Sequence, residues 1–181
     1  MTRFKWNDIL NKNRIKEYRS AKKNFDGRDE FENDYDRILF SASFRRLQDK
    51  AQVFPLEKLD FVRTRLTHSL EVSSIGKSLG MIIGLQLIPL TKGTDDEINF
   101  QMVEEIGNVL SCAGLIHDLG NPPFGHFGEV AIREWFASKL KKNKDGSFYF
   151  KFEEYEFKLE RQEALDLLNF EGNAQGLRIL T

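Results

Sequence analysis

Two consecutive prolines, Pro122 and Pro123, interrupt the most regular helical pattern of this 181-residue sequence. Proline lacks a backbone N–H and disfavours helical geometry in the residue before it, so a helix has to end ahead of this pair. The upstream pattern predicts a helix from the acidic residues 95–97 to about Leu119, and the downstream pattern predicts another over about 126–141. The chain is therefore expected to turn sharply between two helices.

This turn carries an unusual set of imidazoles and carboxylates. Its sequence, GLIHDLGNPPFGHFGE, contains His117, Asp118, His126 and Glu129, and the third histidine of the chain, His68, lies upstream in RTRLTHSLEV. Inward-facing His68 and His117 on two antiparallel helices could close on one ion together with Asp118. Imidazole and carboxylate donors suit Mn²⁺, Fe²⁺, Zn²⁺ or Mg²⁺. Taken singly, a histidine on an apolar stripe is more often an ordinary core residue, and a His-Asp pair often occurs by chance.

His126 and Glu129 form a second pair within the same segment. Residues three apart on a helix are neighbours, so the Glu129 carboxylate can orient the imidazole and favour its charged form. The helix N-terminus opposes that effect. The combination suits a general acid that works near neutral pH. The alternative is that Glu129 occupies the first helical turn only because of the helix dipole.

The remaining pattern is also mostly helical. A helix over about 35–50 is expected to be capped by Asn33 or Asp34, and a long one is expected over about 64–87. Residues 147–157 read as a hairpin or strand pair, with a loop as the alternative, and the last segment is helical with an interruption at Gly172. On the long helix, the residues predicted to face inward are His68, Val72, Ile75, Leu79 and Ile82. On the helix before the prolines, they are Ile106, Leu110, Ala113 and His117. We therefore expect a mainly α fold, with an N-terminal arm over 1–34 and one domain over 35–181.

Composition narrows the function classes. Apolar residues make up 40% and charged residues 30% of the chain, as in ordinary globular proteins, and the net charge is −1. Net charge thus indicates neither a nucleic-acid nor a membrane partner, although residues 45–65 are locally basic and would fit a triphosphate or single-stranded nucleic acid. No signal-peptide pattern or membrane span is expected, and Cys112 is expected to be a buried inert thiol. The default expectation is a cytoplasmic protein.

The motifs, taken together, resemble one family. The strings YDRILFSASFRRLQDKAQVFP, RTRLTHSLEV, GLIHDLGNPPFGHFGE and FEGNAQGLRILT are similar, in this order, to those of the bacterial dGTP triphosphohydrolases of the HD-domain superfamily. The resemblance implies an all-α HD fold and hydrolysis of a dNTP, with dGTP expected first, to deoxynucleoside and tripolyphosphate. It also implies a divalent metal, Mn²⁺ or Mg²⁺ first and Fe²⁺ or Zn²⁺ as alternatives, and a homo-oligomer.

The resemblance assigns roles to individual residues. It makes His68, His117 and Asp118 metal ligands, with His126 as the acid that protonates the leaving 5′-oxygen and Glu129 as its assistant. It makes Arg65 a contact for the α-phosphate, because a guanidinium suits the charge of a triphosphate. The residues that it places near the substrate, or in support of the site, are Gln52, Val53, Arg46, Asn173 and Gln175.

One departure from the family pattern concerns the fourth metal ligand. In the family an aspartate follows the FEGNAQ segment, and neither Asp145 nor Asp166 matches it, so the chain resembles the N-terminal portion of such an enzyme. Two alternatives therefore stay open. The chain could be a non-catalytic module for oligomerisation, regulation or nucleic-acid binding, or an HD phosphohydrolase for another nucleotide.

Overall fold

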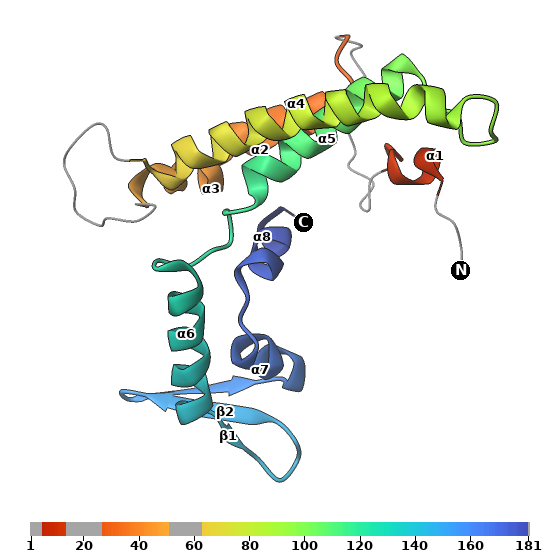
Figure 1. Cartoon of the computed structure of the whole chain (residues 1–181). Helices are drawn as coiled ribbons and strands as arrows, with labels where there is room; N and C mark the ends of the chain where they lie inside the picture. Colours follow the sequence, from red (N-terminus) through yellow and green to blue (C-terminus); the bar gives the residue numbers. More distant parts are fainter. Residues whose placement is uncertain (1–4, 14–26, 51–62, 181) are drawn as a thin grey trace. The chain divides into compact units, whose positions relative to one another are not determined.

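The computed structural model describes residues 5–13, 27–50 and 63–180. These residues are mostly helical, with one small antiparallel sheet, which confirms the predicted mainly α class (Figure 1). The chain divides into two compact units, Met1–His117 and Asp118–Thr181, and each is described by itself. Gln52 and Val53, and most of the basic segment 45–65, lie outside the described residues.

The first unit begins with short helices. Its elements are α1 (Trp6–Ile9), α2 (Glu30–Leu39), α3 (Ala42–Arg45), the 3₁₀ helix η1 (Arg46–Asp49), α4 (Arg65–Thr91) and α5 (Phe100–Ile116). The prediction of one helix over 35–50 is wrong. Asp29 forms a capping box with Glu32, which starts α2 earlier, and the Ser41 hydroxyl caps α3 by accepting a hydrogen bond from the Phe44 amide. The missed signal was the Asp-x-x-Glu spacing at residues 29–32.

The long helix α4 confirms the predicted helix over 64–87, but its predicted inward stripe is wrong from Ile75 onward. Ile75, Leu79 and Ile82 are 50% or more exposed, whereas the small residues Ser69, Ser73, Gly80 and Gly84 are buried. α4 packs along α5 through these small residues, and the two helices run side by side in Figure 1. Hydrophobicity alone misassigned the face because close helix packing here selects for small side chains.

The α4–α5 contact is polar as well as close. The Ser73 hydroxyl lies 2.9 Å from the Ser111 carbonyl oxygen, to which it donates, and 2.8 Å from the Ser111 hydroxyl. A Cβ atom at Gly114 would lie 2.5 Å from Ser73 Cα, so only glycine lets the two backbones approach this closely here. In α5, Ile106 is buried as expected, but Leu110 and Ala113 are exposed, which is the same rotation error as in α4.

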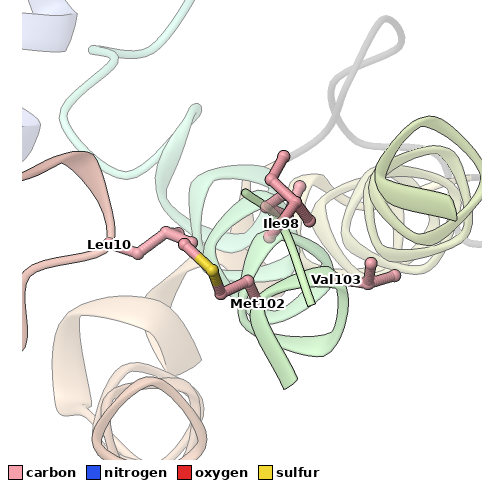
Figure 2. Packing of buried hydrophobic residues seen from close by; sticks show 5 residues of the cluster. Leu10, Ile98, Met102 and Val103 are labelled. Carbon is pink, nitrogen blue, oxygen red and sulfur yellow. The ribbon is translucent and has the colours of Figure 1, made fainter. Parts of the chain in front are cut away.

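A small apolar core anchors α1 to the start of α5. Leu10, Ile98, Met102, Val103 and Ile106 form this cluster, and Figure 2 shows the Leu10 side chain directed at Met102. The backbone amide of Trp6 also donates a hydrogen bond to Asp96 Oδ1 at 2.8 Å. The aromatic N-terminal segment therefore packs on the first unit where it is described.

Cys112 is half-buried in α5, and its thiol donates a hydrogen bond to the Phe31 carbonyl oxygen at 3.5 Å. Burial, followed by the nearby charge of Asp34, raises the pKa of the Cys112 thiol to about 11. A thiol with such a pKa is a weak nucleophile at neutral pH. The inert thiol expected from the sequence fits this environment.

The second unit joins a helix to a hairpin. Its elements are α6 (Gly125–Lys139), β1 (Lys141–Lys142), β2 (Phe148–Phe152), β3 (Tyr155–Leu159), α7 (Arg161–Leu168) and α8 (Gly172–Leu180). The predicted hairpin at 147–157 is confirmed: β2 and β3 pair antiparallel across a two-residue turn, with Phe152 opposite Tyr155. α6 begins after Phe124, whose φ of 66° is left-handed, so the chain reverses locally behind the two prolines.

One result differs from the expectation that no segment approaches a membrane span. α4 has 27 residues and a mean hydropathy of 1.3 in its most apolar window, which is enough to cross a membrane by length and composition. A helix that is apolar all round is also typical of the interior of a large globular protein. The half-buried His68 and the buried Arg65 in its first turn favour that second explanation.

Candidate functional site

The first turn of α4 presents His68. Thr64 and Thr67 form a reciprocal capping box, in which each side chain accepts a hydrogen bond from the other residue's amide. This cap fixes the start of the helix at Arg65 and places His68 one turn inside it. Its ring meets the ring of His117 edge to face, with 5.2 Å between the ring centroids. The side chains of His68 and His117, which were expected to face inward, therefore contact each other.

His117 ends α5 and presents a defined ring nitrogen. Its Nδ1 lies 2.8 Å from the Gly114 carbonyl oxygen, one turn earlier. Because a carbonyl oxygen can only accept, Nδ1 carries the proton and Nε2 keeps its lone pair for a metal. A backbone carbonyl that orients a ligating histidine in this way is a common feature of metal sites.

Asp118 follows His117 directly and completes a three-residue group. One donor atom from each of His68, His117 and Asp118 can be chosen so that all lie within 4.8 Å of one another. Ligands that share one ion at bonds of about 2.1 Å lie at most ~4.2 Å apart, so small side-chain rotations would close the group on an ion. Two imidazoles and a carboxylate are a fitting donor set for a divalent transition metal.

Asn121 is a supporting residue that the sequence reasoning missed. Its side-chain amide donates a hydrogen bond to Asp118 Oδ1 at 2.6 Å, and Asp118 itself is only 7% exposed. The amide therefore holds one carboxylate oxygen in place, as partners of metal ligands generally do. The available signal was an asparagine three residues after the aspartate in a turn, which is within reach of its side chain.

His126 and Glu129 form the second candidate pair, in the first two turns of α6. His126 Nδ1 lies 2.9 Å from Glu129 Oε2, and Glu129 Oε1 accepts a hydrogen bond from the Gly172 amide at 2.8 Å. These bonds, that to His126 first, hold the pKa of Glu129 below its usual range, so the carboxylate is ionised at neutral pH. Glu129 is 3% exposed, whereas the His126 side chain is 88% exposed.

The pair has the geometry of an oriented acid. An ionised carboxylate accepts, so His126 Nδ1 carries the proton and Nε2 faces solvent as the exchanging nitrogen. A Cβ at Gly172 would disturb this arrangement, because it would overlap the Asn121 side-chain oxygen and lie 2.9 Å from Glu129 Oε1. The FEGNAQ segment thus supports the acid pair through a backbone amide, which a sequence motif alone does not reveal.

The other predicted site residues are less clearly placed. Arg65 starts α4, three residues before His68, and is 6% exposed, whereas Arg46 lies exposed in η1. Asn173 and Gln175 lie in the first turn of α8, where the Asn173 amide donates a hydrogen bond to Glu171 Oε1 at 2.9 Å. Nothing in these contacts marks them as substrate ligands, and their roles stay predictions.

Comparison with known proteins shows the family of this chain. A family model described as the HD domain matches residues 65–175, a range that includes all three metal-ligand candidates and the acid pair. A deoxyguanosinetriphosphate triphosphohydrolase-like protein of Listeria monocytogenes is 49% identical over 98% of this chain and 37% of its own length. A protein of the same name from Synechocystis is 44% identical over 98% of the chain and 37% of its length.

A deoxyguanosinetriphosphate triphosphohydrolase of Serratia proteamaculans is 39% identical over 88% of the chain and 34% of its own length. The chain thus spans about a third of the length of the curated relatives that it matches. The HD model covers more than half of the chain, and the candidate site residues lie within it. On these grounds the chain belongs to the HD-domain family.

Proposed function

We propose that this chain carries the metal-binding residues and the general acid of a dNTP triphosphohydrolase. The first candidate substrate is dGTP. The observation that carries the proposal is the group formed by His68, His117 and Asp118, whose donor atoms lie within 4.8 Å. The names of the similar proteins point to dGTP, and the motif resemblance points to deoxynucleoside and tripolyphosphate as products. Gln52, Val53, Arg46, Asn173 and Gln175 are proposed as substrate contacts on the resemblance alone.

His68, His117 and Asp118 would hold the ion. Mn²⁺ is proposed first, because two imidazoles favour a borderline transition ion over Mg²⁺, which prefers oxygen ligands. Fe²⁺ and Zn²⁺ fit the same donors. A bound divalent ion would supply charge stabilisation at the phosphate and a more acidic water. On the protein side, Asn121 would keep Asp118 oriented, and the Gly114 carbonyl would keep His117 in the ligating tautomer.

His126 is proposed as the general acid for the leaving group. When the bond between the α-phosphorus and the 5′-oxygen breaks, that oxygen takes on negative charge and needs a proton. His126 Nε2 can deliver it, while Glu129 stabilises the imidazolium through Nδ1. Arg65 is proposed to contact the α-phosphate, since a guanidinium pairs well with phosphate oxygens.

Product identity is the decisive measurement. The purified chain is incubated with dGTP and Mn²⁺, and products are separated by anion-exchange chromatography. Deoxyguanosine and tripolyphosphate in equal amounts are expected. Deoxyguanosine monophosphate with pyrophosphate would contradict the proposal, because it requires a different bond to break.

Variants separate metal binding from proton transfer. Asp118→Ala is expected to weaken Mn²⁺ binding by at least tenfold in calorimetry, because it removes the only anionic ligand of the group. His126→Ala is expected to keep the Mn²⁺ affinity but lower turnover by about 10²–10⁴-fold. His126→Ala that abolishes Mn²⁺ binding would show that His126 has been assigned the wrong role.

A second candidate function follows from the length comparison. Because the chain spans about a third of its relatives, it could serve as the metal-holding part of a larger protein or assembly without turnover of its own. Mn²⁺ binding without dGTP hydrolysis would favour this function. Nucleic-acid binding has less support, because Arg65 is buried and the exposed Arg63 already pairs with Glu71 at 3.4 Å. A cytoplasmic location remains part of the proposal.

A further inference from the structure

The hairpin of the second unit is amphipathic in an unusual way. Residues on one face are almost all aromatic, and residues on the other are charged or polar, as the pairs Phe150↔Phe157 and Lys151↔Glu156 show. α6 covers part of the aromatic face, where Trp135 meets Phe150 edge to face at 5.9 Å. The rest remains an open apolar groove of about 600 Å³, lined by Ala131, Ile132, Trp135, Phe136, Phe150, Phe152 and Phe157.

The strand β3 leaves one edge of this sheet open. In the described part of the chain the strand order is β1-β2-β3, so β3 pairs only with β2. In a hairpin closed by a two-residue turn, the flanking residues Phe152 and Tyr155 form a pair of the hydrogen-bonded kind. The backbone groups of Tyr155 and Phe157 therefore face β2, and those of Glu156 and Lys158 face the open edge. An open edge of this kind is a template for another strand.

The sequence of β3, YEFKL, is self-complementary about its centre. If a second copy pairs antiparallel with Phe157 opposite Phe157, Glu156 of each copy stands opposite Lys158 of the other. This register uses the outward backbone groups of Glu156 and Lys158, as hydrogen bonding requires. It also extends an existing contact, because Lys151 Nζ already lies 3.3 Å from Glu156 Oε2 within one copy. A row of alternating charge would then cross three of the four strands, from Lys151 through Glu156 to Lys158 of the second copy, with Tyr149 of that copy on the fourth strand.

The same register also covers exposed aromatic side chains. Phe157 is 44% exposed and Tyr155 is 67% exposed in the single chain. Pairing places Phe157 against its own copy and Tyr155 against Leu159, so the two open grooves become one continuous apolar surface. Aromatic cross-strand pairs and opposite charges that face each other both stabilise paired strands.

From these observations we propose that β3 is a self-association edge, through which two copies of this chain form a symmetric dimer with a continuous sheet. The partner strand belongs to a second copy of the chain, because the charges of β3 complement each other in only this antiparallel register. The interface is isologous, as expected for a twofold dimer. It involves none of the residues proposed for metal binding or proton transfer.

Charge reversal tests the register. Sedimentation velocity over a concentration series measures the dimer dissociation constant of the full chain. Either single variant, Glu156→Lys or Lys158→Glu, creates two pairs of like charges in the dimer. Each is expected to raise the dissociation constant about tenfold or more. An equimolar mixture of the two variants restores both opposite-charge pairs, so a heterodimer is expected to form. Lys144→Glu, in the exposed turn before β2, is the matched control and should leave the dimer unchanged.

A cross-link provides a second readout. In a Cys112→Ser background, Phe157→Cys brings two cysteines opposite each other in a pair that is not hydrogen-bonded, within the Cα separation that a disulfide needs. Mild oxidation should give a covalent dimer, whereas Lys158→Cys on the same strand should not. A monomer at all concentrations overturns the proposal. So does a dimer that neither charge reversal weakens, because association would then use another surface, such as the apolar face of α4.

Discussion

At the scale of single residues, Glu129 connects three parts of the second unit. It is buried, it accepts a hydrogen bond from the Gly172 amide, and its other oxygen binds the His126 ring. A buried acceptor with two good partners stabilises the fold, and its loss leaves donors without a partner. The same residue thus orients the proposed acid and holds α8 to the start of α6.

This dual role predicts a pH-dependent stability. Because the pKa of Glu129 is lowered in the folded state, its contribution is present above the unfolded pKa of about 4.3 and is lost as the pH falls through the folded value. Glu129→Gln is expected to cost about 1–3 kcal/mol of unfolding free energy at pH 7 and clearly less at pH 3. Urea titrations followed by Trp135 fluorescence, in a Trp6→Phe background, measure the difference.

The exposed Glu134 on the same helix supplies the control. Glu134→Gln makes the same chemical change without a buried hydrogen bond and is expected to change stability by less than about 0.5 kcal/mol. An equal loss in Glu129→Gln at pH 7 and pH 3 would show that packing, and not the ionised carboxylate, is responsible.

At the scale of secondary structure, the contact between α4 and α5 positions the two histidines. Ser73 in α4 lies against Gly114 in α5, a short distance along each helix from His68 and His117. The approach of the two backbones sets how near the imidazoles come. The small residues of this contact therefore serve the candidate metal site as well as stability.

Gly114→Ala tests this dependence. The added methyl group would lie 2.5 Å from Ser73 Cα, so the helices have to separate. We expect a loss of about 1–3 kcal/mol in unfolding free energy, because overpacking a close contact costs that much. We also expect weaker Mn²⁺ binding in calorimetry. Ala113→Leu, at the exposed neighbouring position, should change neither the stability nor the Mn²⁺ affinity. If Gly114→Ala leaves the Mn²⁺ affinity unchanged, the helix contact does not position the metal ligands.

At the scale of the whole molecule, α4 presents several large apolar side chains at exposed positions. Ile75 is 61%, Leu79 50% and Ile82 54% exposed, on a helix that is apolar nearly all round. Large exposed apolar patches mark surfaces that bind other protein segments.

Dye binding measures this surface. The chain is expected to enhance the fluorescence of anilinonaphthalene sulfonate at neutral pH while its circular dichroism remains native. Ile75→Lys combined with Ile82→Lys, two turns apart on α4, should reduce that fluorescence substantially without loss of helicity. An unchanged signal would place the dye elsewhere, for example in the aromatic groove beside β2 and β3.

The sequence by itself determined the helical class, the hairpin at 147–157 and the turn at Pro122 and Pro123, and it named the candidate site residues. Prolines, helical periodicity and strand alternation act locally, so they can be read without neighbours. The strings around His68 and His117 also sufficed to indicate the HD family, which the family match confirmed.

Only the tertiary structure decided which helix faces meet and which groups orient the site. The stripe through Ile75 and Leu79 was the wrong face of α4, because close packing selected Ser73 and Gly80 over larger apolar residues. The bonds from Asn121 to Asp118 and from the Gly172 amide to Glu129 depend on backbone positions that no residue pattern specifies. The residue types of a site are local information, whereas their orientation is a property of the packed chain.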